Sequence, residues 1–477
     1  MNIKRLNMAF LIVMISCSSI FFSSCKQQSM EGMIVFTETP RDLKDINYIT
    51  GNSWRYIPNS RIVALNPNKP KEKLKVLTKD FFSACSPNIS YDGNFMLFAA
   101  QKKQNDIWQI FEMNLKNLKA RQVTSSTENC IDPAYLPGQR FVFSKLTSDA
   151  IMKQGYALFT GNLDGTEISQ ITFNPQAYFG STVMEDGRIL TISKQFYPNQ
   201  KDGMLMALRP DGTKEELFYQ GLKGTNIYSR GSETNNGKII FVESDNKDQN
   251  GKNIISINYN RPLNSKVSLS SGIKGDFNSA IPLKEGKLLV SYRSSDDEHY
   301  SLYEFDTENK TLGQVIYKDK NYNVLEAEVV EKRERPKKLP SEVNMSAKTG
   351  MLLCQNINFS DTLSTEFIPS SSKAVKIELM GIENSFGEVN VEKDGSFYLK
   401  VLADTPFRIQ TIDENGHIVN GPCNWIYLRP NERRGCVGCH EDNEQVPENR
   451  QLLSSKKGPV IIPEPTMGSP KNQRSLK

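Results

Sequence analysis

Histidine is the scarcest metal-binding residue of the chain, because the 477 residues hold only His299, His417 and His440. Three imidazoles cannot supply a multi-histidine metal centre or a cytochrome with many bis-histidine haems, so both classes are excluded. The sequence also lacks the nucleophile elbow of α/β-hydrolases and the paired-histidine helix motif of zinc proteases. A hydrolase therefore finds no support.

Charge and hydrophobic length exclude two further classes. The 59 Lys and Arg residues exceed the 54 Asp and Glu residues by too little to predict binding to nucleic acid. Beyond the N-terminus, no stretch approaches the ~20 apolar residues that a membrane-spanning helix needs. With 38% hydrophobic residues, the chain still has enough apolar surface for large cores in two or three domains.

The N-terminus has the pattern of an export signal. Lys4 and Arg5 precede an apolar run over residues 8–22, which is too short for a stable membrane span. Small residues then lead to Cys25, as in bacterial lipoprotein signals. We therefore predict a signal peptide over residues 1–24 and lipidation of Cys25.

Two alternatives to this lipidation site remain. Cys17 follows Ile15 and Ser16 and is a weaker competitor, and an ordinary secretory signal needs no cysteine at all. Both alternatives export the protein. Lipidation of Cys25 would anchor the chain to a membrane through two or more lipid tails, with residues 25–32 as a tether. The predicted location is the cell envelope, as a lipoprotein of the outer membrane that faces the periplasm or the cell surface.

Residues 33–334 repeat short β-rich segments separated by Asp-Gly or Asn-Gly turns, the pattern of successive antiparallel hairpins. One unit comprises residues 86–98, 106–114 and 122–124, and weaker copies follow it. A repeat of roughly 45 to 55 residues with four strands predicts a β-propeller, here with six blades and similar to TolB-type propellers. Each Asp-Gly is interpreted as a turn without chemistry.

Cys85 and Cys130 stand just before equivalent strands of neighbouring units. A disulfide or a pair of thiols in the central channel is one interpretation. We favour the other, in which both act as small buried hydrophobic residues.

Residues 335–349 are rich in charge and proline and predict a linker. Alternating strand patterns follow, separated by further Asp-Gly and Asn-Gly turns. They predict a small antiparallel β-sandwich within residues 350–445. Residues 446–477 have a Pro- and Lys-rich composition that predicts a disordered tail. The predicted fold class is therefore all-β, a propeller followed by a sandwich.

The sandwich ends in Cys436-Val437-Gly438-Cys439-His440, the attachment signature of c-type haem. Cysteines three residues apart can form thioethers with both haem vinyl groups, and the next residue brings an imidazole to the iron. With 8 Cys and 3 His in the chain, chance predicts on the order of 10⁻³ such patterns. We predict one covalent haem c, with Cys436 and Cys439 as attachment points and His440 as the iron ligand.

Two alternatives to haem are a Cys436–Cys439 disulfide and a zinc knuckle. Zinc would need two more ligands close by, which only Cys354 and Cys423 of this region offer. Export of the chain supports haem, because covalent haem attachment in bacteria takes place outside the cytoplasm.

Five motifs, the last of which contains this signature, resemble the haem-bearing middle domain of the hydrazine synthase alpha subunit family. They occupy residues 387–389, 393–397, 403–407, 413–416 and 425–440. The resemblance implies a six-bladed propeller packed on a domain whose haem has one protein imidazole, His440, and an open or weakly held far side. It also implies Cys436 and Cys439 as the attachment points.

The sequence departs from that family in two respects. No second Cys-x-x-Cys-His motif accompanies the first, and Glu441, Asp442 and Glu444 stand after His440 where a tyrosine ligand would be needed. Hydrazine synthesis depends in the family on other subunits and haems, so we do not expect this activity of the chain alone.

The far side of the iron has few candidate ligands. His417 follows a turn and is predicted to be exposed, whereas His299 follows three acidic residues and is predicted to be solvated in a hairpin. A methionine, Met467 included, could serve instead. We predict a mainly five-coordinate or water-ligated iron, since neither spare imidazole lies where the fold points it at the haem.

Two functions follow from these features. The first is a redox role for an exported haem lipoprotein, which either relays electrons to a partner protein or acts on a small nitrogen or oxygen species. Only the second of these roles would make it an enzyme. The alternative function is a binding module, in which the propeller recognises a protein or glycan and the haem is structural or sensory.

Overall fold

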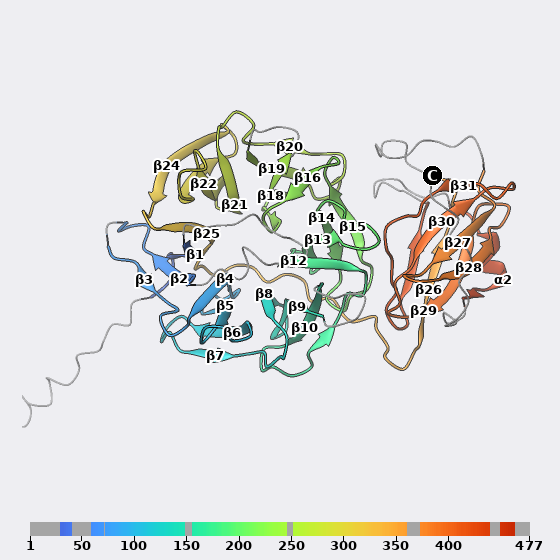
Figure 1. Ribbon diagram of the computed structural model, residues 1–477, viewed down its shortest axis with the longest axis horizontal. Coiled ribbons are helices and arrows are strands. Elements are labelled where there is room, and N and C mark those ends of the chain that lie inside the picture. The colour runs from blue at the N-terminus through green and yellow to red at the C-terminus, as the bar shows by residue number, and fades with distance from the viewer. Residues whose placement is uncertain are drawn as a thin grey trace, which may run out of the picture.

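The computed structural model describes residues 29–40, 59–70, 72–147, 155–245, 251–359, 373–438 and 449–462. Within these ranges the regular secondary structure is almost entirely β strand, with one short helix, α2 (Leu453–Lys457). A ring of sheets stands beside a two-sheet sandwich (Figure 1). No helix in the described ranges is long and apolar enough to cross a membrane. The predicted all-β fold class is confirmed.

Six sheets make up the ring and are called blades 1 to 6 in chain order. Blade 1 contains β1 (Ile34–Pro40), β2 (Arg61–Leu65), β3 (Lys75–Val76) and β25 (Tyr322–Val329). Blade 2 contains β4 (Ser83–Ile89), β5 (Phe95–Gln101), β6 (Gln109–Asn114) and β7 (Ala120–Gln122). Blade 3 contains β8 (Cys130–Leu136), β9 (Arg140–Leu146), β10 (Tyr156–Asn162) and β11 (Ser169–Gln170).

The remaining blades follow the same plan. Blade 4 contains β12 (Gln176–Val183), β13 (Ile189–Gln195), β14 (Met204–Leu208) and β15 (Glu216–Gln220). Blade 5 contains β16 (Thr225–Ile227), β17 (Ser232–Glu233), β18 (Lys238–Asp245), β19 (Lys252–Asn258) and β20 (Val267–Ser268). Blade 6 contains β21 (Asp276–Pro282), β22 (Lys287–Arg293), β23 (Ser301–Asp306) and β24 (Thr311–Tyr317).

Blade 1 closes the ring with strands from both ends of the propeller. β25 pairs antiparallel with β1, and Ile34 lies opposite Val329. The repeat pattern assigns the N-terminal strands to one unit but does not supply this fourth strand. Closure pairs two edges that would otherwise expose unpaired backbone groups.

The predicted turns and buried cysteines are as expected. Gly187 and Gly212, each after an aspartate, have φ of 92° and 83°, the left-handed conformation that glycine adopts without strain. Cys85 and Cys130 lie in the same buried hydrophobic cluster. Burial raises the pKa of the Cys130 thiol to about 11. This confirms the interpretation of these cysteines as buried hydrophobic residues.

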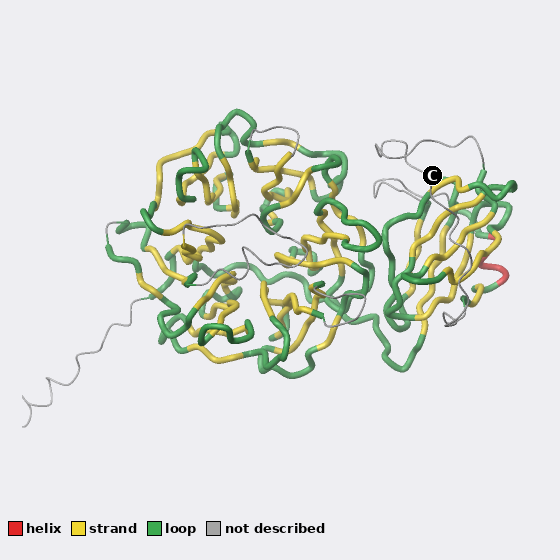
Figure 2. Tube along the Cα trace, in the orientation of Figure 1, coloured by secondary structure: helices red, strands yellow, loops and turns green. Residues whose placement is uncertain are grey.

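The chain between β25 and the sandwich has no helix or strand over residues 330–348. Figure 2 shows it as a loop that crosses the ring toward the sandwich. It is fastened on the way, because Arg333 N donates to Tyr91 O and Lys337 N donates to Glu185 O. The predicted linker therefore runs along the propeller and contacts its blades.

The sandwich consists of two four-stranded sheets. The first has the order β32 (Arg433–Cys436), β26 (Thr349–Cys354), β29 (Phe397–Leu402) and β33 (Val460–Ile461). The second has the order β28 (Ser385–Asn390), β27 (Lys376–Met380), β30 (Arg408–Ile412) and β31 (Ile418–Asn420). Side chains of β29 alternate between buried and half-buried, and Leu399 lies in the core between the sheets.

One detail differs from the predicted antiparallel sandwich. β32 pairs parallel with β26, and β33 pairs parallel with β29. Both added strands come late in the chain and reach the sheet edges by long connections, which parallel pairing requires.

Part of the predicted disordered tail is ordered. Residues 449–462 lie against the sandwich, where Leu452 and Ile462 are buried. Leu453 N donates to Asp394 Oδ2 at 3.0 Å, and Lys457 forms an ion pair with Glu392. The composition-based prediction is wrong for this segment, because a few apolar residues at the correct positions suffice to dock a short strand and helix.

Candidate functional site

The first cysteine of the haem signature stands at the end of β32. Cys436 is half-buried against the sandwich core, and its Cα lies opposite that of Cys354 on β26. Cys436 O accepts a hydrogen bond from Gln355 N at 2.9 Å, and Val437 O accepts one from Asn356 N at 3.1 Å. The start of the signature is thus held as an extension of a sheet.

The glycine of the signature, Gly438, packs closely against the backbone of Phe359. A Cβ added at Gly438 would lie 2.3 Å from the carbonyl oxygen of Phe359, so no larger residue fits without a backbone shift. Cys439 and His440 lie outside the described residues, as do Cys17, Cys25 and Met467. The two thiols and the imidazole of the signature are the donor set of a c-type haem, so its chemistry fits that group.

The alternative zinc ligands lie in different places. Cys354 is buried beside Cys436, whereas Cys423 N donates to Ile409 O of the opposite sheet. Among the described residues, no group of three His, Cys, Asp or Glu side chains could hold a metal ion.

The segment that leads into β32 packs on the propeller through aromatic residues. Tyr427 is fully buried, and its hydroxyl lies 2.9 Å from the carbonyl oxygens of Ile171 and Gly212. Trp425 Nε1 donates to Tyr197 O at 2.9 Å. The sandwich is therefore attached to blade 4 and to the connection that precedes it.

A buried carboxylate joins the two domains just before the haem signature. Glu432 is fully buried, and its Oε1 accepts from Lys214 N of blade 4 at 2.8 Å. The same oxygen accepts from Arg434 Nε and Nη2 at 3.0 and 2.8 Å. Its Oε2 accepts from Arg429 N at 2.8 Å. Such charge-assisted bonds offset the desolvation of a buried ion pair.

The propeller side of this contact carries a second buried carboxyl. Glu215 accepts from Tyr178 Oη at 2.7 Å and from Asn174 Nδ2 at 2.9 Å, and its own carbonyl oxygen accepts from Arg434 Nη1 at 3.2 Å. Burial raises the pKa of Glu215 to about 7, although Tyr178 and Arg434 lower it, while Glu432 raises it. We call Glu215, Glu432 and Arg434, with Tyr178 and Asn174, the interdomain cluster.

The cluster was not predicted from the sequence. Charged residues are rarely buried, so the run from Glu432 to Arg434 would be placed on the surface. The available signal is the neighbouring sequence, because large aromatic residues at 425 and 427 in a loop indicate an interface.

The two spare histidines have different environments. His417 is 77% exposed, with Nδ1 3.4 Å from Asp413 Oδ2, as predicted for a residue after a turn. His299 is only 8% exposed, so the predicted solvated position is wrong. The acidic residues before His299 indicate a surface hairpin, but the histidine itself is followed by the buried Tyr300 and by β23, which begins with the buried Ser301 and Leu302.

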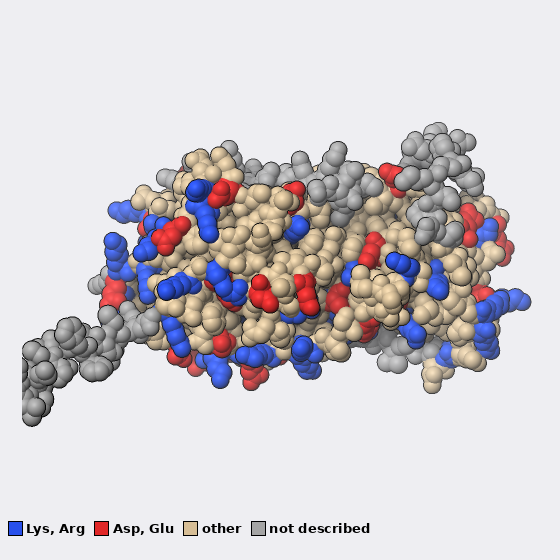
Figure 3. Space-filling view, turned by 90° about the horizontal axis from the view of Figure 1, so that it is seen from below, with Lys and Arg blue, Asp and Glu red and all other residues tan. Residues whose placement is uncertain are grey.

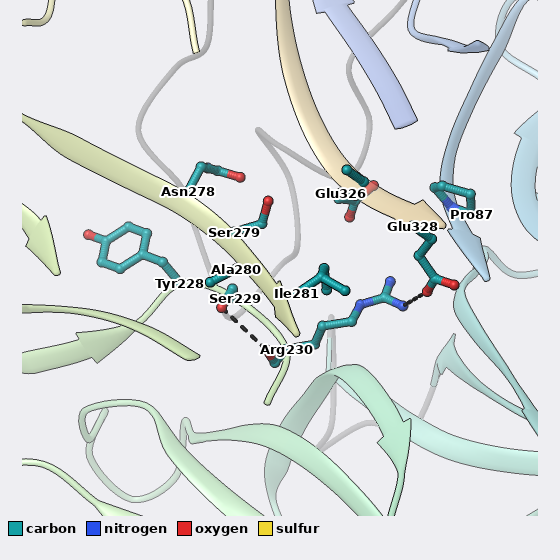
Figure 4. Close-up of a pocket in the computed structure, with 11 residues that line it drawn as sticks. Pro87, Tyr228, Ser229, Arg230, Asn278, Ser279, Ala280, Ile281, Glu326 and Glu328 are labelled. Carbon is teal, nitrogen blue, oxygen red and sulfur yellow. Dashed lines mark hydrogen bonds and ion pairs between the residues drawn. The ribbon is translucent and has the colours of Figure 1, made fainter. Parts of the chain in front are cut away.

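A pocket in the propeller lies between β21, β25 and the segment before β17 (Figure 4). Arg230 points to Glu328, with Nη1 3.7 Å from Oε1. The neighbouring Glu326 accepts from Ser86 N at 2.8 Å and from Thr37 Oγ1 at 3.1 Å. These carboxylates connect the inner strands of blades 1 and 2, which is a structural role.

The surface carries charges of both signs. On the face shown in Figure 3, Lys and Arg side chains are interspersed with Asp and Glu over both domains. This agrees with the small net charge of +5.

Comparison with known proteins agrees with this description. Residues 318–441 match the family model of the hydrazine synthase alpha subunit middle domain. Hydrazine synthase subunit alpha of Kuenenia stuttgartiensis is 24% identical over an alignment that covers 87% of this chain and 66% of that protein. The chain therefore spans about two thirds of that relative.

A solved structure shows the same fold. Hydrazine synthase of Kuenenia stuttgartiensis superposes with a TM-score of 0.77 at 21% identity, covering 91% of this chain and 72% of that one. TolB of Acinetobacter baumannii gives a TM-score of 0.44 at 11% identity, covering 66% and 70% of the two chains. The resemblance predicted from the motifs between residues 387 and 440 is confirmed by the family model and the curated relative.

Proposed function

We propose that this hydrazine synthase alpha-like chain is an exported redox protein that carries one covalent haem c. Its role is electron transfer or redox chemistry on a small nitrogen or oxygen species. The observation that carries the proposal is the complete Cys-x-x-Cys-His signature, which begins at the last residue of β32 inside the region that matches the family model. A bound haem supplies an iron that changes between two oxidation states and can hold a small ligand.

The chain's own residues have separate tasks in this proposal. Cys436 and Cys439 would hold the ring by thioether bonds, and His440 would bind the iron. β32 fixes the position of the first thiol, because the strand pairs with β26. The carbonyl oxygens of Cys436 and Val437 also accept hydrogen bonds from the two residues that follow β26. Mass spectrometry of the mature chain tests the proposal by the presence of one haem.

The far side of the iron is expected to be open. Of the described imidazoles, His417 belongs to an exposed turn and His299 is buried beside β23 of blade 6. We expect the ferrous protein to be high-spin without added ligand and to bind carbon monoxide, as followed by absorption spectroscopy. A low-spin ferrous spectrum in the absence of any added ligand would contradict this expectation.

We further propose that the chain is a lipoprotein anchored through Cys25 in the cell envelope. The pattern of residues 1–24 supports this, and so does the location of covalent haem attachment outside the cytoplasm. The Cys25→Ser variant is expected to lose labelling by a fatty acid and to leave the membrane fraction. Cys17→Ser is the matched control and should keep both properties. Equal membrane binding of the two variants would reject Cys25 as the anchor.

A further inference from the structure

β32 carries both a domain contact and the start of the haem signature. Arg434 and Cys436 are two residues apart in this strand, so they lie on the same face, roughly 7 Å apart along the chain. The Arg434 side chain is almost fully buried and bonds Glu432 and the Glu215 carbonyl oxygen. Only Gly435 separates this contact from the first haem thiol.

Glu432 connects this strand to a part of the propeller that cannot easily move. Its partner on blade 4 is the backbone N–H of Lys214, in the turn where Gly212 has φ of 83°. A Cβ added at Gly212 would lie 2.1 Å from the carbonyl oxygen of Ile171, so the turn is pressed against the preceding connection. The donor is therefore held by backbone packing.

Tyr427 fixes the other end of the same segment. Its hydroxyl lies 2.9 Å from the two carbonyl oxygens that meet at this place, those of Ile171 and Gly212. Arg429 stacks over Phe173 between the two ends, with its guanidinium 4.8 Å from the ring centre. The segment 427–434 thus contacts the propeller at both of its ends and between them.

We propose that blade 4 supports the strand that carries the haem attachment, and that Glu432 and Arg434 are positioning residues that hold β32 on the propeller so that the haem is presented in one orientation. This inference depends on the proposed haem attachment. The propeller then has a role in the haem domain, because its contacts with Glu432 and Arg434 hold the strand to which the haem is attached.

Arg434→Lys and Glu432→Gln test this proposal in the full-length protein matured with haem. Lysine keeps the charge of Arg434 but cannot make the forked contact with both Glu432 and the Glu215 carbonyl. We expect both variants to retain covalent haem, with a shifted midpoint potential and a carbon monoxide association rate changed severalfold. Arg188→Lys is the matched control, because Arg188 lies in blade 4 and bonds Asp186 and Glu216 instead.

The control should lower the melting temperature while leaving the potential and the association rate as in the parent. If Arg434→Lys and Glu432→Gln also change only the melting temperature, the two residues are merely structural and the proposal is overturned. If a substitution at 434 prevents folding, Tyr427→Phe serves as a second test, because it removes one hydroxyl at the other end of the segment 427–434. An unaltered carbon monoxide association rate in this variant counts against the proposal. A parent protein without haem would instead reject the proposed function.

Discussion

Replacing either thiol of the signature is expected to give the largest effect, because each thioether depends on one sulfur. Cys436→Ala and Cys439→Ala should each lose one thioether. The double variant should retain no covalently bound haem, so no haem should stay with the chain after denaturation. His440→Ala should lose the iron ligand and with it the visible spectrum of the parent. Haem-stained denaturing gels and absorption spectra measure these losses.

Two other cysteines provide controls for this series. Cys423→Ala changes a half-exposed cysteine of the same domain, and Cys130→Ala changes a buried cysteine of the propeller. Both variants should keep stoichiometric haem. If the double variant retained covalent haem, or if Cys423→Ala lost it, the assignment of Cys436 and Cys439 would be wrong.

Glu215 is expected to make the stability of the protein depend on pH. The pKa of its carboxyl rises from the ordinary value of about 4.5 to about 7 on folding, because the group is buried. The folded state therefore binds the proton more tightly than the unfolded state does. Stability from this group is complete below about pH 4.5 and is lost as the pH rises toward 7. The shift corresponds to about 3 kcal/mol of unfolding free energy.

The Glu215→Gln variant removes this titration. Denaturant unfolding at several pH values between 4.5 and 8 should give a flatter profile for the variant than for the parent. Glu216→Gln is the matched control, because the adjacent Glu216 is 42% exposed and pairs with Arg188. Its profile should run parallel to that of the parent. Parallel profiles for Glu215→Gln as well would show that the buried carboxyl does not titrate in this range.

The propeller was predictable because its information is local. Turns such as Asp186-Gly187 and Asp211-Gly212 need a positive φ, and a strand follows each of them, β13 after the first and β15 after the second. The pairing of β25 with β1 joins residues that are almost 300 positions apart. No local pattern specifies such a partner.

The contact between the domains was not predictable for a different reason. The burial of Glu432 depends on donors from Lys214, Arg429 and Arg434, which only the folded chain brings together. His299 and the segment around Leu452 show the same limit. Charge and composition of neighbouring residues indicated exposure in both cases, whereas packing against distant strands determined burial.

The haem signature could be predicted from the sequence alone, because its chemistry depends on the spacing of three side chains within five residues. What the structure adds is the support around Cys436: the parallel strand β26 on one side and the interdomain cluster two residues before it. A motif of this kind can be recognised in the sequence, but the part of the propeller that contacts its strand cannot.

The intact mass of the mature protein, produced in a host that attaches haem c, tests the central claim most directly. We predict a mass increased by one haem, with the modified peptide containing both Cys436 and Cys439. A mass without haem, with these two thiols joined to each other or bound to zinc, would contradict the account.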